Sequence, residues 1–556
     1  MQRTVFIPAL ASGVLAAVLM VPATRPVGAE DPTPGQEFAG QADLDEATLV
    51  KLSAKRLGDW GKVITLCESA LEKGLDEGNA FFAKELLTST LYQRALQICQ
   101  PIFDGAKPDR KWPQLRQFAL KDLENIIRHD DQMGDVHLLM ARLLVLPGGD
   151  RQRAAKAVRQ AVPLLQSDPV GLSKALVLKA GLHKNAQQQL VDLSEAVKQD
   201  PNNLDALKMR GVVHLALGDH QSAIADFKTI VANDPGDLTA HQGFAEALDS
   251  AEKYDEALEQ ADKIIELVPK LPVGYILRAR FHHRKGDVKA TLADLGEAIK
   301  IEPRSLRALM MRAQIYHERG DVQPARADVE RALTLRPGYQ PAILLRSSLA
   351  AAAGQLEQAI ADIDTLLQGN GNNPLLLVQL AALHAADRRP RKAIEIYNQV
   401  VTKHAANWAA LRGRADARLS IGQHADAIDD FEAAMKLQAH DDGILNNFAW
   451  VLATSPNERL RDGRRAIELA KTACELTEYK KPHILSTLAA GYAETGDFQM
   501  AIRWSEKAVQ LGQPPVKEQL AKELQSYKAN KPWREKQLIQ EKGDAQPPED
   551  DEADLN

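Results

Sequence analysis

The residues that most often carry catalytic or metal chemistry are few in this sequence, and their spacing does not suit that chemistry. His282 and His283 are adjacent, and adjacent residues on a helix point to different faces, so a shared metal ion is not expected. Residues 129–131 and 440–442 both read His-Asp-Asp. The second triplet stands at a turn before an apolar helical pattern, where an Asp side chain caps the next helix. We therefore predict no metal site.

The cysteines also give no sign of a reactive or metal-binding site. Three in 556 residues exclude a disulfide scaffold, and the chain has no Cys-x-x-Cys pair, which argues against a zinc ribbon or a thioredoxin-type site. Cys67 and Cys99 fall in two different predicted helices, and their pairing in an oxidising compartment stays open. Cys474 is predicted to be a core residue.

Sequence motifs of common catalytic sites are missing as well. The chain has no phosphate-binding Gly-x-x-x-x-Gly-Lys-Ser/Thr loop, no dinucleotide-binding Gly-x-Gly-x-x-Gly, no His-Glu-x-x-His and no Gly-x-Ser-x-Gly. We predict that the protein is not an enzyme and that it has no catalytic residue, bound cofactor or metal.

The distribution of charge gives no reason to expect nucleic acid or an anionic membrane as a partner. The whole chain carries −6, and residues 541–556 hold seven acidic residues and one lysine, so residues 1–540 sum to zero. A neutral body has no general attraction for polyanions. The acidic end contains proline and no aromatic residue, and we predict that it is disordered.

The first 29 residues are typical of a secretory signal peptide. A short basic start precedes an apolar run over 5–21, and small residues lead up to Ala29. This pattern predicts cleavage after Ala29 and a periplasmic or secreted protein with no membrane span after cleavage. The alternative is an uncleaved anchor, because residues 4–23 are long enough for a marginal transmembrane helix. Two prolines and a glycine within that stretch weaken the alternative.

The middle of the chain repeats with a period of 34 residues. Six of seven positions in one series are alanine, five of the seven residues that stand five positions earlier are glycine, and a proline follows twelve positions later in the first four units. Chance is a poor explanation for three series in phase. The first series is Ala223, Ala257, Thr291, Ala325, Ala359, Ala393 and Ala427.

Each repeated residue type has a structural role in a pair of helices. Apolar residues spaced i, i+3 and i+4 predict two helices in each unit. The glycine ends the first helix, the alanine allows two helix backbones to approach closely, and the proline ends the second helix. One helical hairpin cannot bury both of its faces, so stacked hairpins form a solenoid.

These offsets resemble the tetratricopeptide repeat (TPR) family, and in particular an exported bacterial TPR protein. The resemblance implies an all-α fold, a right-handed superhelical solenoid of antiparallel helix hairpins, whose function is to bind other proteins. The unit that begins at Leu306 supplies the small, aromatic, glycine, alanine and proline positions of the family pattern: Ala313, Tyr316, Gly320, Ala325, Ala332 and Pro337.

The repeats and their flanks predict six segments. We expect about eleven hairpins, nine of them between 204 and 512, with an enlarged hairpin loop in the stretch 453–463. The predicted segments are a signal peptide at 1–29, a flexible linker at 30–42, degenerate helical repeats at 43–203, the TPR array at 204–512, a capping helix and extension at 513–540, and the acidic tail at 541–556.

The family resemblance also implies which residues line the inner groove of the solenoid. We expect a polar segment beside a more apolar one, either as a solvated face without a specific ligand or as a peptide groove. In the second case Arg280 and His283 contact an acidic or C-terminal group. The Lys and Asn residues of the family's carboxylate clamp do not recur here. The candidate groove residues are Gln242, Glu246, Asp249, Arg280, His283, Met310, Gln314, His317, Leu344 and Val378.

The favoured hypothesis is a non-enzymatic scaffold or adaptor of the cell envelope that binds proteins or peptides along its concave face. One alternative is a non-catalytic subunit of an envelope enzyme complex. Another is a membrane tether that keeps its N-terminal helix. The sequence does not identify the partner, the pathway or the oligomeric state.

Overall fold

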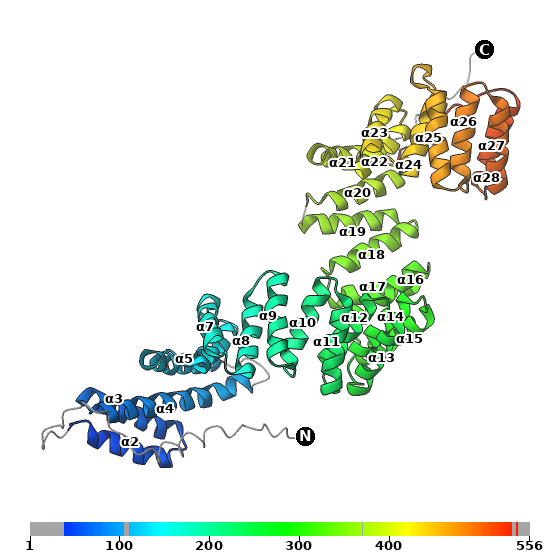
Figure 1. Cartoon of the computed structure of the whole chain (residues 1–556). Coiled ribbons are helices and arrows are strands. Elements are labelled where there is room, and N and C mark those ends of the chain that lie inside the picture. The colour runs from blue at the N-terminus through cyan, green and yellow to red at the C-terminus, as the bar shows by residue number, and fades with distance from the viewer. Residues whose placement is uncertain (1–37, 105–109, 370, 536–540, 543–556) are drawn as a thin grey trace. The chain divides into compact units, whose positions relative to one another are not determined.

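The computed structural model describes residues 38–104, 110–369, 371–535 and 541–542 (Figure 1). Throughout these residues the chain is helical, and they contain no strand. The predicted signal peptide, most of the predicted linker and nearly all of the acidic tail lie outside them. The chain divides into two compact units, residues 1–253 and 254–556.

The first unit consists of consecutive helices that pack on their neighbours in chain order. Its cysteines Cys67 and Cys99 are buried and unpaired, so the pairing left open by the sequence does not form. Its helices are α2 (Gln41–Ser53), α3 (Leu57–Lys73), α4 (Glu77–Phe103), α5 (Trp112–His129), α6 (Gly134–Val145), α7 (Arg151–Leu164), α8 (Pro169–Leu182), α9 (Ala186–Gln199), α10 (Leu204–Ala216), α11 (His220–Asn233) and α12 (Leu238–Ser250).

The second unit has the same construction and ends in a single helix, α28, as the sequence predicted. Its helices are α13 (Tyr254–Leu267), α14 (Val273–Arg284), α15 (Val288–Ile301), α16 (Leu306–Glu318), α17 (Val322–Leu335), α18 (Gln340–Ala352), α19 (Leu356–Gly369), α20 (Pro374–Ala386), α21 (Pro390–Lys403), α22 (Trp408–Ser420), α23 (His424–Leu437), α24 (Asp442–Thr454), the short 3-10 helix η2 (Glu458–Leu460), α25 (Gly463–Leu476), α26 (Pro482–Glu494), α27 (Phe498–Leu511) and α28 (Val516–Lys528).

The predicted antiparallel hairpins are present, and we call the two helices of each hairpin the A helix and the B helix. In the second unit the even-numbered helices from α14 to α26 are A helices, and each packs on the B helix that follows it. The enlarged loop predicted within 453–463 contains η2 between α24 and α25. Cys474 is buried in α25, as expected for a core residue.

Left-handed backbone conformation ends most A helices at the predicted glycine. The five glycines of that series have φ between +73° and +79°, a region that residues with a Cβ adopt only with strain. The other two residues of the series, Glu252 and Arg388, have φ of 58° and 57°. The turn therefore keeps its geometry even where the sequence lacks glycine.

The alanine series marks the closest packing in the repeats. All six alanines and Thr291 have no exposed surface. The Thr291 hydroxyl donates a hydrogen bond to the Asp287 carbonyl one turn earlier, at 2.7 Å, so its polar atom is satisfied inside the helix. A larger side chain at these positions would force two helices apart.

Five hairpins contain the same buried ion pair, which the sequence analysis did not identify. An arginine of the A helix donates two hydrogen bonds, through Nε and Nη2, to an aspartate 16 residues later on the B helix, at 2.6–3.0 Å. Bidentate geometry strengthens such a pair. The aspartates are only 2–5% exposed. The pairs are Arg210–Asp226, Arg278–Asp294, Arg312–Asp328, Arg346–Asp362 and Arg414–Asp430.

Three of these arginines also join one hairpin to the preceding one. The third guanidinium nitrogen, Nη1, reaches a side chain 16 residues earlier, on the preceding B helix. Arg278 contacts Asp262 at 2.7 Å, Arg346 contacts Glu330 at 3.4 Å, and Arg414 contacts Asn398 at 2.7 Å. The hairpin of α20 and α21 instead places Leu380 and Ile396, both buried, at the two positions of the pair.

We expect Arg312→Leu to lower the free energy of unfolding by about 3 kcal/mol, because it leaves the buried Asp328 carboxylate without its partner. The double variant Arg312→Leu/Asp328→Ile introduces the residues that the chain itself uses at positions 380 and 396, and it should recover most of that loss. Urea unfolding followed by circular dichroism measures both changes. A midpoint for Arg312→Leu equal to that of the parent would show that the pair is not needed to hold the hairpin. Equal, lowered midpoints for the two variants would show that the loss does not come from the unpaired carboxylate.

Candidate functional site

The predicted groove residues all keep some solvent exposure. Gln242, Glu246 and Asp249 lie on α12 in the first unit. The other seven lie on A helices of the second unit, from α14 to α20. There, α16 contacts α18, α20 contacts α22 and α22 contacts α24, and His283 of α14 lies beside Glu318 of α16. We call the exposed side chains of the A helices from α14 to α24 the A-helix face.

The polar part of the A-helix face is held together by contacts between neighbouring helices. His283 Nε2 on α14 lies 3.7 Å from Glu318 Oε2 on α16. Gln314 Nε2 donates a hydrogen bond to the other oxygen of Glu318 at 3.1 Å. His317 Nε2 lies 3.3 Å from the Ser348 hydroxyl on α18. The Arg280 guanidinium lies 5.0 Å from the centre of the Phe281 ring.

Glu318 alters the expected charge of this part of the face. The sequence predicted an acidic ligand for Arg280 and His283, but the structure already places a carboxylate beside His283. Glu318 was missed because the family's groove positions skip it. Binding of an acidic group by Arg280 and His283 stays a prediction.

The apolar part of the face lies on α18 and α20 and exposes two large side chains. Leu344 is 37% exposed and Leu375, the second residue of α20, is 68% exposed. The sequence analysis did not single out Leu375. Val378 is half-buried and Ala382 is exposed next to it on the same helix. Exposed leucines on a folded surface are available for burial by a partner.

A hydrogen-bonded polar cluster lies on the next two A helices, α22 and α24. Asn446 Nδ2 donates to Asn447 Oδ1, and Asn447 Nδ2 donates to Asp416 Oδ1, both at 2.8 Å. The buried Asn446 Oδ1 accepts no hydrogen bond from the residues that the structure describes. Arg412 Nε lies 3.9 Å from the Asp416 carboxylate, while its Nη1 donates to Asp441 at 3.1 Å.

Asp416 combines access to water with an unfavourable environment for its charge. Its side chain is 39% exposed. The surrounding protein nevertheless removes enough water to raise the pKa of the Asp416 carboxyl to about 6, although the Asn447 hydrogen bond and Arg412 oppose the shift. An exposed carboxylate that is poorly solvated gains from a cationic partner more than a fully hydrated one does.

The raised pKa of Asp416 predicts a pH-dependent effect on stability. The folded-state pKa, about 6, exceeds the ordinary value, so the folded protein binds the proton more tightly and loses stability as the pH rises from the ordinary carboxyl pKa through about 6. Asp416→Asn should therefore be more stable relative to the parent at pH 8 than at pH 5. Urea midpoints of both proteins across this range test it. A difference that is independent of pH would contradict the raised pKa.

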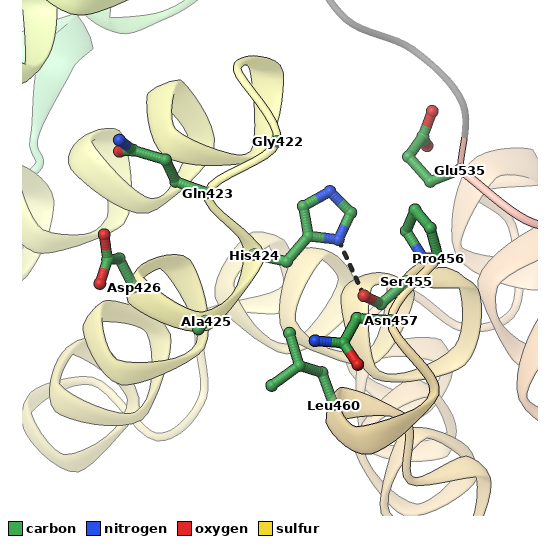
Figure 2. A pocket seen from close by; sticks show the side chains of 10 residues that line it. All are labelled: Gly422, Gln423, His424, Ala425, Asp426, Ser455, Pro456, Asn457, Leu460 and Glu535. Carbon is green, nitrogen blue, oxygen red and sulfur yellow. Dashed lines mark hydrogen bonds between the residues drawn. The ribbon is translucent and has the colours of Figure 1, made fainter.

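A pocket of about 520 Å³ in the second unit is lined by none of the residues named above for the A-helix face (Figure 2). The turn between α22 and α23 forms one wall, and the residues after α24 form another. His424 Nδ1 lies 3.0 Å from the Ser455 hydroxyl, and burial lowers the pKa of His424. Glu535 completes the lining from the C-terminal segment.

Serine, histidine and a carboxylate around one pocket invite comparison with a hydrolase triad, but the geometry does not support it. Ser455 has no exposed surface, so its hydroxyl cannot meet a substrate. The Glu535 carboxylate accepts a hydrogen bond from Trp450 Nε1 at 2.8 Å, and Figure 2 draws no bond between it and the imidazole. In the part of the chain that the structure describes, no cluster of three His, Cys, Asp or Glu residues suits a metal ion.

Comparison with protein families assigns the repeats. One family model, described as a tetratricopeptide repeat, matches residues 190–237, 278–340 and 378–442. A second with the same description matches residues 214–280. The matched segments coincide with the helical hairpins and their left-handed turns. These segments of the chain are tetratricopeptide repeats.

Known proteins similar to this TPR protein match only parts of it in sequence. The mouse FK506-binding protein-like is 32% identical over 119 residues, 20% of this chain and 34% of that protein. The mouse Superkiller complex protein 3 is 29% identical over 153 residues, 27% of this chain and 10% of that protein. The chain thus spans about a third and a tenth of these relatives.

Among solved structures, the yeast Tom70 structure aligns over 88% of this TPR protein and 96% of its own chain, at 16% identity and a TM-score of 0.35. Within the residues described for the TPR protein, no helix is both long and apolar enough to cross a bilayer.

Proposed function

We propose that this TPR protein is a non-enzymatic scaffold of the cell envelope that binds a protein segment on the A-helix face of its second unit. The exposed side chains of Leu344 and Leu375, on the two A helices that precede the Asp416 cluster in the array, support this function best. TPR repeats commonly serve protein interactions, but a fold does not identify a partner, so the chemistry of the face has to do so.

The side chains of the face define the kind of segment that fits. Burying a leucine side chain contributes about 1.5–3 kcal/mol, so apolar residues of the partner would cover Leu344 and Leu375. A lysine or arginine of the same segment would pair with the exposed Asp416 carboxylate. We therefore infer a partner segment with apolar residues followed by a basic one.

A displayed library of random peptides, panned on the full chain, tests this inference. We expect enrichment of peptides that combine apolar residues with lysine or arginine. Leu375→Asp should weaken the selected peptides by about tenfold or more, since it removes at least about 1.4 kcal/mol of apolar burial. Asp416→Asn should reduce the preference for the basic residue while apolar selection persists.

Leu437→Asp is the matched control, because Leu437 is 44% exposed but is the last residue of the B helix α23. It should bind the selected peptides as the parent does. If Leu375→Asp and Leu437→Asp bind equally, the A-helix face is not the binding surface.

The envelope location in this proposal rests on the signal-peptide pattern of residues 1–29 alone. We expect the mature protein to begin at Glu30. N-terminal sequencing of protein recovered from its native cells provides the test, and a mature chain that begins at Met1 would instead favour the uncleaved anchor.

A further inference from the structure

The last residues that the structure describes contact hairpins that lie much earlier in the sequence. Trp533 follows the capping helix α28 and packs against a buried cluster formed by residues of α26, α27 and α28. The next two residues contact the end of α24, more than 80 positions earlier. Lys542 contacts residues at the end of α20 and the start of α19, 155 and 185 positions earlier. Both contact regions are carboxyl ends of A helices or the turns that follow them.

The first contact region satisfies carbonyl groups that α24 leaves without partners. A helix cannot satisfy its last four carbonyls internally. The Leu452 carbonyl accepts from the Asp462 amide of the hairpin's own loop, at 3.0 Å. The next two carbonyls accept hydrogen bonds from the C-terminal segment. Arg534 Nη1 donates to Ala453 O at 3.3 Å, and the Glu535 amide donates to Thr454 O at 2.9 Å.

Charge reinforces this contact. The carboxyl end of a helix carries partial negative charge, which favours a cation such as Arg534. Arg534 Nη2 also lies 2.6 Å from Glu494 Oε2 on α26. The Glu535 carboxylate accepts from Trp450 Nε1 and forms part of the pocket in Figure 2.

The second contact region repeats this pattern two hairpins earlier. The Lys542 amide donates to the Arg388 carbonyl at 3.0 Å, just beyond the end of α20. Its ammonium group lies 2.9 Å from Asp387 Oδ1, a nearly buried carboxylate, and 3.0 Å from Glu357 Oε1. A second pocket of about 640 Å³ opens beside these residues and is lined in part by Lys542.

We propose that this row of A-helix ends is a second docking surface, whose ligand is an extended segment with spaced basic residues, and that the chain's own C-terminal residues occupy it in the free protein. We call it the turn edge: residues 354–358, 387–389, 422–426 and 453–457. Between the two contact regions, the end of α22 presents Gly422 and Gln423 to the pocket of Figure 2. The turn edge is separate from the A-helix face, and the proposal does not depend on it.

The contacts of the C-terminal residues with the turn edge are of a kind that a partner segment could displace. The side chain of Arg534 is 27% exposed and that of Lys542 is 38% exposed, and both are held by polar contacts. Ion pairs whose cation keeps contact with water weaken as the salt concentration rises. Trp533 tethers the segment, which keeps its effective concentration at the edge high, on the order of mM. A basic segment of a partner therefore competes with a weak but always present intramolecular ligand.

A labelled synthetic peptide of residues 531–545 is the probe, added in trans to the full chain. The parent should bind it poorly, because its own segment occupies the edge. The full-chain variant Arg534→Ala/Lys542→Ala should bind it at least about tenfold more tightly, and rising salt should weaken that binding. A peptide that carries the same two substitutions should bind neither protein.

The charge-matched control is Lys517→Ala/Lys528→Ala, which removes two cations from α28 without touching the turn edge. Lys528 pairs there with Glu506 across an exposed contact. This control should behave as the parent does, and melting curves confirm that all variants fold. Equal binding of the peptide by the parent and the Arg534→Ala/Lys542→Ala variant, or binding by neither, would overturn the proposal. So would equally tight binding of the substituted peptide.

Discussion

The structure depends on the close approach of helices at one position in every repeat. The six alanines and Thr291 of that series are fully buried, and at such a spacing no larger side chain fits without moving a helix. Because each hairpin is stable only against its neighbours, an error at one contact affects the whole stack. The low aromatic content of the chain follows from this geometry, since small residues rather than large rings fill the interfaces.

The buried arginine–aspartate pairs are a second repeated constraint, and they limit how hairpins align. A bidentate pair tolerates little change in the orientation of its two helices, and Nη1 of three arginines extends the constraint to the preceding hairpin. Burying a charged pair is not inherently more stabilising than burying apolar side chains. In one hairpin Leu380 and Ile396 stand where the others have arginine and aspartate, so the chain fills these two positions with either a charged or an apolar pair.

Most of the fold could be predicted from the sequence because it is set by local, repeated signals. The 34-residue series gave the hairpins, their left-handed turns and the enlarged loop before α25. The arginine–aspartate pairs had a readable signal too, a 16-residue spacing inside each unit, which was overlooked. The long-range contacts of Arg534 and Lys542 had no such signal in the sequence. Their partners lie 81 and 155 residues earlier, and these separations do not repeat along the chain. Glu318 was missed because the groove positions transferred from the family do not include it.

The two proposed surfaces differ in the groups that they offer to a partner, which are side chains on the A-helix face and backbone carbonyls at the turn edge. The A-helix face offers side chains that packing does not constrain, so its chemistry changes along the array, from His283 and Glu318 to Leu375 and Asp416. The turn edge offers backbone carbonyls, which every helix must leave unsatisfied whatever its sequence. The first kind of surface selects a partner by side-chain identity. The second selects for backbone amides and cations at the helix ends, which Arg534, Glu535 and Lys542 supply.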